Sequence, residues 1–277
     1  MSAEKIKAVA LDLDGTLLGP GAALSERSVT AVKACIRRGL KIIIATGRSI
    51  DASERFRAPL DARGPMIYFN GALVADMPGQ KNFKTTLMDT AAASCCVDIS
   101  RETGVYFQAF LPCEESRIKL VAEQSGPERE MYHKHTGILA ETGDLMEELA
   151  RPGLPGCIKG MFLAEPEVQT VLRAKLGERL GGSVYIAQTL RNFLEVMDAK
   201  VSKGEGLKTA MERLSLKKEE IIAFGDEEND LPMFSAAGFS AAPANARDSV
   251  RKAADIVIGL SADDGVAVFL EEFFGLR

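Results

Sequence analysis

Four short apolar runs, each directly followed by polar residues, constrain the fold of this 277-residue chain most strongly. The runs are Ile6–Leu11, Lys41–Ala45, Met66–Phe69 and Ile221–Phe224. Amphipathic helical patterns alternate with them along the chain. Apolar strands that are continuous rather than alternating are typical of a parallel sheet with helices on both faces. The sequence therefore predicts an α/β fold built on such a sheet.

The middle of the chain has a different character. From about Asn82 to Ala187 the strand patterns carry more polar residues, and the stretch Pro112–Pro155 is rich in Glu, Gly and Pro. We expect residues 80–190 to form an inserted α+β domain with an open sheet. Residues 1–79 and 191–277 would form the two parts of the core, the second part beginning with a strand at Phe193–Met197, where the parallel pattern resumes.

Composition excludes several classes of protein. Hydrophobic residues make up 46% and charged residues 26%, which argues against disorder. The net charge is −5 without a long basic run, so we expect no nucleic-acid partner. No run approaches the ~18 apolar residues of a membrane span, so we expect no membrane association. The start of the chain lacks a signal-peptide apolar region, and the five cysteines lack zinc-type spacing, which together predict a cytoplasmic protein. Oligomeric state is not readable from the sequence.

Polar residues gather at the expected carboxyl ends of the strands. Asp12 and Asp14 follow the first run, Thr46-Gly47 follows the second, and Asp226 follows the fourth. Ligands of open α/β sheets bind outside these strand ends. Each motif alone also fits a helix cap or a turn. Together they indicate one site for phosphate and a divalent cation.

Each residue type in this set has a chemical use. Mg²⁺ prefers hard oxygen ligands, which Asp12 and Asp226 supply. An aspartate such as Asp12 can attack phosphorus and form an aspartyl-phosphate, while Asp14 serves as general acid and base. The hydroxyl and backbone N–H of Thr46, with the ammonium of Lys203, fit the non-bridging oxygens of the phosphoryl group.

The order of the motifs resembles that of a known family. D-x-D-G-T at Asp12, T-G-R at Thr46, S-K-G at Ser202 and G-D-x-x-N-D at Gly225 are similar to the motifs of the haloacid dehalogenase-like superfamily, in particular its Cof-like, type IIB sugar-phosphatase branch. Asn70-Gly71-Ala72 also resembles a recurrent element of that branch. The resemblance implies a Rossmann-like core with an inserted cap. It further implies Mg²⁺ as cofactor and a small phosphorylated metabolite, by default a sugar phosphate, as substrate.

The resemblance also implies a role for each site residue. Asp12 looks like the nucleophile, Asp14 like the acid and base, and Asp226 like a Mg²⁺ ligand beside Asp12 and the backbone carbonyl of Asp14. The residues that would hold phosphate are Leu13, Thr46, Gly47, Lys203 and Asn229. The residues that would lie around them or reach substrate are Arg48, Asn70 and Asp230. Asp230 would orient Lys203, whereas Arg48 would either reach substrate or brace its loop.

Three questions stay open at this point. A phosphomutase uses the same two aspartates as a phosphatase, and a non-catalytic protein that binds phosphate esters is the alternative from another class. Asp14 argues against the dehalogenases and ion pumps of the superfamily, in which this carboxylate is replaced.

The sequence departs from the family pattern in one loop. Where relatives commonly show Met-Gly-Asn-Ala, this chain reads Ala242-Pro243-Ala244-Asn245-Ala246. The proline removes a backbone donor, which leaves the geometry of this loop open.

Overall fold

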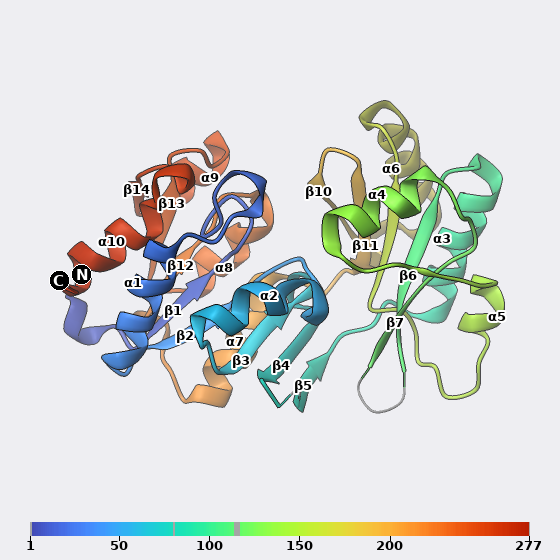
Figure 1. Ribbon diagram of the computed structural model, residues 1–277. Coiled ribbons are helices and arrows are strands. Elements are labelled where there is room, and N and C mark those ends of the chain that lie inside the picture. The colour runs from blue at the N-terminus through green and yellow to red at the C-terminus, as the bar shows by residue number, and fades with distance from the viewer. Residues whose placement is uncertain (1, 80, 114–116, 277) are drawn as a thin grey trace. The chain divides into compact units, whose positions relative to one another are not determined.

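The computed structural model describes residues 2–79, 81–113 and 117–276, which form two compact units (Figure 1). The core unit comprises Met1–Lys84 and Ser202–Arg277, and the inserted unit comprises Thr85–Val201. The sequence analysis expected these divisions near residues 79 and 190. Gln80, where the insertion was expected to begin, lies outside the described residues.

A five-stranded sheet lies at the centre of the core unit, with strand order β14-β13-β12-β1-β2. Each neighbouring pair of strands runs parallel, which confirms the predicted parallel sheet. The strands are β1 (Ala8–Leu11), β2 (Lys41–Ile44), β12 (Ile221–Phe224), β13 (Phe239–Pro243) and β14 (Ile256–Ile258). β1 is buried along its whole length, as expected for a strand between two neighbours and two helical layers.

Helices cover both faces of this sheet (Figure 1). On one face, Ala10 and Ala223 share a buried apolar cluster with Leu207 of α7 and Met233 of α8. On the other face, the ring of Phe224 lies 5.5 Å from that of Phe269 in α10. The helices of the core unit are α1 (Glu26–Arg37), α2 (Ile50–Leu60), α7 (Lys203–Leu214), α8 (Leu231–Ala236), α9 (Asp248–Ala253) and α10 (Gly265–Phe274). The Rossmann-like architecture implied by the resemblance is therefore present.

A smaller sheet of order β3-β4-β5 completes the core unit. Its strands are β3 (Gly64–Tyr68), β4 (Leu73–Met77) and β5 (Lys81–Thr85). β3 pairs antiparallel with β4, whereas Ala45 and Ile67 form an isolated parallel bridge. β3 thus continues the parallel succession, as expected from Met66–Phe69, and also starts a hairpin that the sequence analysis did not predict.

The inserted unit contains a six-stranded sheet of order β10-β11-β9-β6-β7-β8. Its strands are β6 (Phe107–Pro112), β7 (Ile118–Ala122), β8 (Glu141–Thr142), β9 (Lys159–Leu163), β10 (Val184–Leu190) and β11 (Phe193–Asp198). Its helices are α3 (Thr90–Thr103), α4 (Pro127–Thr136), α5 (Leu145–Leu149) and α6 (Pro166–Leu180). Residues of α3, α5 and α6 share one apolar cluster with the sheet.

The expected placement of the strand at Phe193–Met197 in the core was wrong. This strand, β11, pairs antiparallel with both β10 and β9 and belongs to the inserted unit. β10 ends at Leu190 and β11 begins at Phe193. A connection this short makes an antiparallel hairpin, whereas a parallel pairing needs a long crossover.

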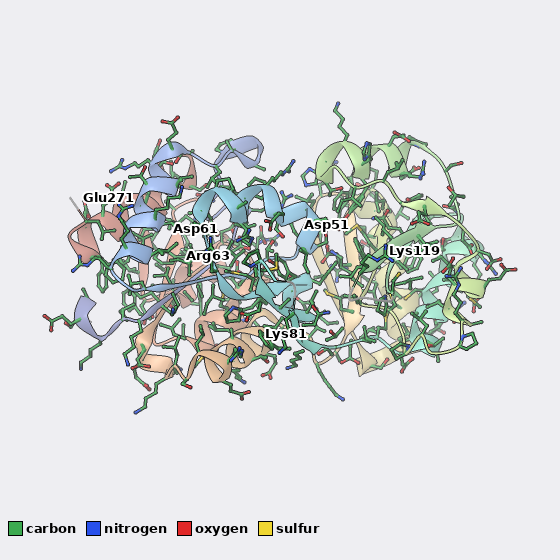
Figure 2. All side chains as sticks on the ribbon, turned by 60° about the horizontal axis from the view of Figure 1, so that its bottom comes forward. Asp51, Asp61, Arg63, Lys81, Lys119 and Glu271 are labelled. Carbon is green, nitrogen blue, oxygen red and sulfur yellow. The ribbon has the colours of Figure 1, made fainter. Side chains whose placement is uncertain are left out.

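Charged side chains such as Asp51, Asp61, Arg63 and Lys81 are exposed on the core unit (Figure 2). Asp61 and Arg63 form a surface ion pair of 2.9 Å. Among the described residues, no helix is long and apolar enough to cross a membrane.

Candidate active site

Three neighbouring strands of the parallel sheet bring the sequence motifs to one edge. Leu11 of β1 lies opposite Ile44 of β2 and Phe224 of β12, so the three strands end at the same level. Asp12 follows β1 directly, and its N–H donates to the carbonyl of Phe224 at 3.0 Å. Because the strands are parallel, the polar residues that follow them meet at this edge.

Lys203 connects two of the carboxylates. Its Nζ donates to Oδ1 of Asp12 at 2.5 Å and to Oδ1 of Asp230 at 2.6 Å. Lys203 begins α7, whose N-cap is Ser202, and its side chain is almost completely buried. The amine is therefore fixed between the two acids, and the structure brings Asp230 to Lys203 as the sequence analysis expected.

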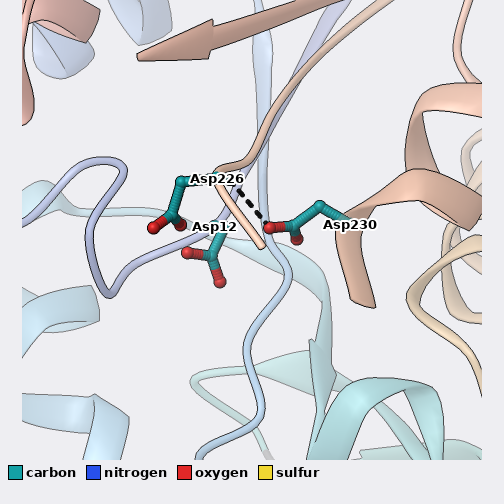
Figure 3. A group of neighbouring side chains, drawn as sticks. All are labelled: Asp12, Asp226 and Asp230. Atoms are coloured by element: carbon teal, nitrogen blue, oxygen red, sulfur yellow. Dashed lines mark hydrogen bonds between the residues drawn. The ribbon is translucent and has the colours of Figure 1, made fainter. Parts of the chain in front are cut away.

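Asp226 faces Asp12 from the end of β12 (Figure 3). Its Oδ1 accepts a hydrogen bond of 2.8 Å from the hydroxyl of Thr16. One oxygen each of Asp12, Asp226 and Asp230 lie within 4.8 Å of one another, close enough to hold a metal ion. Asp230 is the least available of the three, since its Oδ1 binds Lys203 and its Oδ2 accepts the N–H groups of Asp226 and Glu227. Of the six oxygens of these three carboxylates, Oδ2 of Asp12 and Oδ2 of Asp226 accept no hydrogen bond from the described residues.

Burial sets the electrostatics of this cluster. Desolvation raises the pKa of Asp12 well above its ordinary value, Lys203 opposes this, and the neighbouring carboxylates add to it. Burial and the charge of Asp230 raise the pKa of Asp226 to about 7 against the hydrogen bond from Thr16. Burial alone would lower the pKa of Lys203, but the charges of Asp12 and Asp230 raise it overall. With Asp12, Asp226, Asp230 and Lys203 all ionised, the cluster holds more negative than positive charge, which suits a cation.

The loop after β2 corrects one expectation. The backbone N–H of Thr46 donates to the carbonyl of Ile67 at 2.9 Å, so this N–H is not a phosphate ligand as predicted. The hydroxyl oxygen of Thr46 accepts the N–H of Arg48 at 3.1 Å, which leaves the hydroxyl hydrogen for a ligand. Gly47 lies close to Asn70, since a β-carbon on Gly47 would be 3.0 Å from Oδ1 of that residue. The side chain of Leu13 is fully buried, so only its backbone can reach a ligand.

Asn70 and Asn229 join two of the loops at this edge. Nδ2 of Asn229 donates to Oδ1 of Asn70 at 2.9 Å. Asn70 is fully buried with a positive φ of 56°, and its N–H donates to the carbonyl of Thr46 at 3.0 Å. The amide of Asn229 thus contacts another loop, while the sequence analysis expected it to hold phosphate.

Asp14 and Arg48 form a double hydrogen bond beside this cluster. Nε and Nη2 of Arg48 each donate to one oxygen of Asp14 at 2.7 Å. The Asp14 side chain is about half exposed, whereas that of Arg48 is buried. Asp14 is therefore open to a ligand, as a group that exchanges protons with substrate must be.

Comparison with known proteins decides the family. A family model for haloacid dehalogenase-like hydrolases matches residues 9–270. The chain belongs to this family. It is therefore an enzyme of the hydrolase class, as the resemblance implied.

Relatives of this hydrolase include a phosphatase and a larger plant protein. The 5-amino-6-(5-phospho-D-ribitylamino)uracil phosphatase YitU of Bacillus subtilis is 28% identical over 97% of this chain and 97% of its own. The chloroplastic endoribonuclease YBEY of Arabidopsis thaliana is 29% identical over 95% of this chain, which spans only 46% of that protein. The solved structure of the subclass IIB sugar phosphatase BT4131 is 21% identical with a TM-score of 0.81 and covers 98% of this chain and 100% of its own. The hydrolase thus has the type IIB fold that was expected.

The sequence analysis assigned no role to two residues of the hydrolase that hold this edge in place. Thr16, whose hydroxyl donates to Asp226, is the last residue of the first motif, D-x-D-G-T. Nδ2 of Asn245 donates to the carbonyl of Gly15 at 2.8 Å, and its Oδ1 accepts the N–H of Ser261 at 2.9 Å. Pro243 ends β13 opposite Ile258, so the proline lies within the strand and Asn245 still reaches the first motif.

Proposed function

We propose that this hydrolase is a Mg²⁺-dependent phosphatase that cleaves small phosphate monoesters through an aspartyl-phosphate on Asp12. The observation that carries the proposal is the position of the Asp12 carboxylate. Its Oδ1 accepts a hydrogen bond from Lys203, and its side chain lies beside that of Asp226 (Figure 3). Asp14 offers an accessible carboxylate two residues along the chain. A nucleophile, a cation site and a proton carrier at one strand edge suit phosphoryl transfer.

The residues fit Mg²⁺ by their donor chemistry. Oδ2 of Asp12 and Oδ2 of Asp226 would hold the ion together with the backbone carbonyl of Asp14, and Mg²⁺ typically binds one or two carboxylates. Three carboxylates and the one ammonium of Lys203 leave two negative charges when all are ionised, which a divalent cation balances. When bound, the ion offsets the charge of the phosphate that would otherwise repel Asp12.

The chain's own residues divide the reaction into two balanced steps. In the first, an oxygen of Asp12 forms a bond to phosphorus, the ester P–O bond breaks, and Asp14 gives its proton to the leaving oxygen. In the second, Asp14 takes a proton from water, the water oxygen bonds to phosphorus, and the bond to Asp12 breaks. Lys203 and the Thr46 hydroxyl would donate to the non-bridging oxygens in both steps.

The substrate class is proposed to be sugar or polyol phosphates. The name of the Bacillus subtilis relative specifies a phospho-D-ribityl group on its substrate. The solved structure of a sugar phosphatase of subclass IIB is similar in fold, which supports a common architecture but does not identify the substrate. The partner implied by this function is therefore a small phosphorylated metabolite.

A panel of phosphate esters tests the proposal. The wild-type protein should release inorganic phosphate from at least one sugar or polyol phosphate when Mg²⁺ is present and lose this activity after EDTA treatment. Asp61→Asn, a change on the surface of the core unit, should leave the rate unchanged. Absence of release from every ester would reject the phosphatase. Transfer of the phosphoryl group to a second sugar hydroxyl, without free phosphate, would instead identify a phosphomutase.

A further inference from the structure

The contact between Arg48 and Asp14 has a specific geometry. Nε of Arg48 donates to Oδ2 and Nη2 to Oδ1 of Asp14, both at 2.7 Å. Two parallel hydrogen bonds from a planar guanidinium fix the plane of a carboxylate as well as its position. Asp14 alone, about half exposed, would be free to adopt several side-chain rotamers.

The guanidinium is itself held from several sides. Only 8% of the Arg48 side chain is exposed, and the ring of Phe56 in α2 lies 5.1 Å from its central carbon. The backbone of Arg48 donates to the Thr46 hydroxyl and accepts the N–H of Phe69. The surface pair of Arg63 with Asp61 differs, since those side chains are 69% and 55% exposed (Figure 2). Exposed pairs of this kind hold their partners weakly.

We infer that Arg48 is a positioning residue for Asp14 and not a ligand of the phosphoryl group. Two of its three nitrogens already face Asp14. The orientation that Arg48 imposes lets Asp14 deliver its proton to the leaving oxygen while the ester P–O bond breaks and the bond from Asp12 to phosphorus forms. This inference rests on the proposed phosphatase function and decides between the two roles that the sequence left open for Arg48.

Two esters with different leaving groups separate the roles. An alkyl phosphate needs its leaving oxygen protonated, whereas p-nitrophenol leaves as a stabilised anion. The quantity to compare is kcat/KM, because it covers binding and the first phosphoryl transfer but not the hydrolysis of the aspartyl-phosphate. Arg48→Gln should lower kcat/KM about 10–100-fold for the alkyl ester and about threefold or less for p-nitrophenyl phosphate, since general acid catalysis is typically worth ~10²–10⁴-fold.

Further variants show whether the loss comes from the double hydrogen bond of Arg48, from its positive charge or from a loss of stability. Arg48→Lys keeps the charge but not the double hydrogen bond, so it should behave like Arg48→Gln. Phe56→Leu keeps Arg48 but loosens it, and should show the same selective loss on a smaller scale. The matched control is Arg57→Gln, because Arg57 is also buried and doubly bonded to a carboxylate, Glu54, on the same helix. Arg57→Gln should lose stability without discriminating between the esters.

Combination with Asp14→Asn completes the test. Asp14→Asn should show the same selective loss, and adding Arg48→Gln to it should cause little further loss, because both changes remove one function. Equal losses for both esters in Arg48→Gln, or recovery of the alkyl rate in Arg48→Lys, would overturn the inference. If the wild-type protein releases phosphate neither from these two esters nor from any ester of the sugar and polyol phosphate panel, the proposed function fails instead.

Discussion

Gly15→Ala should disable the site while the fold survives. Gly15 has a φ of 79°, in the left-handed region that favours glycine. A β-carbon at this position would lie 2.2 Å from Oδ2 of Asp226, whereas ordinary contact begins at 3.4 Å. The atoms must therefore separate by about 1.2 Å (3.4 − 2.2). Since Thr16 holds the other oxygen of Asp226, this shift displaces one of the two proposed Mg²⁺ ligands.

The expected magnitudes follow from these distances. The left-handed backbone should cost alanine about 1–2 kcal/mol of folding free energy. A displacement near 1 Å at a reacting centre typically costs about 10²-fold in rate. Gly15→Ala should thus lose about 10²-fold in phosphate release and require more Mg²⁺ for half-maximal activity. Stability is measured by urea unfolding, and activity by initial rates over a Mg²⁺ series.

Gly21→Ala is the matched control. Gly21 has a φ of 70°, and a β-carbon there would meet none of the described atoms within 4 Å. This variant should carry a similar backbone cost but keep the wild-type rate and Mg²⁺ dependence. A wild-type Mg²⁺ response in Gly15→Ala would refute the role given to Asp226. An equal loss of activity in Gly21→Ala would show that backbone strain, and not the displacement of Asp226, causes the loss in Gly15→Ala.

Three further outcomes are expected. Lys159→Met should lower the free energy of unfolding by about 3–5 kcal/mol, because it removes one partner of the buried ion pair of 2.7 Å with Glu195, and Lys159→Met/Glu195→Leu should recover part of this in urea unfolding. At pH 8 a thiol reagent should label exposed Cys113 quickly and spare Cys35 and Cys157, because burial raises the pKa of these thiols to about 11 and about 12 and keeps them protonated. Mg²⁺ at 100 times its Kd should stabilise the protein by about 2.7 kcal/mol, measured as a rise in Tm that EDTA reverses.

Local pattern predicted much of the core unit. β12 at Ile221–Phe224 agrees with the sequence prediction, because a continuous apolar run determines such a strand locally. The sheet to which β11 belongs depends on long-range pairing, which apolarity alone does not reveal. Short elements such as α5 at Leu145–Leu149 give little periodicity and were not predicted from the sequence.

The sequence predicted which residues would form the site better than it predicted the contacts between them. Strand ends predicted that Asp12 and Asp226 would meet. The contact of Asp230 with Lys203 was expected, but the pairing of Arg48 with Asp14 was not, since it joins loops that follow different strands. For the same reason the N–H of Thr46 was assigned to phosphate, although the adjacent β3 already binds it through Ile67.

The most direct test of the central claim is a search for a phosphoryl group on Asp12. The protein is mixed with Mg²⁺ and a phosphate ester that it hydrolyses, quenched in acid and digested, and its peptides are analysed by mass spectrometry. We predict a phosphoryl group on the peptide that contains Asp12, and neither this group nor phosphate release in Asp12→Asn, with Asp61→Asn unchanged. Phosphate release by Asp12→Asn at the wild-type rate would contradict the assignment of Asp12 as the nucleophile.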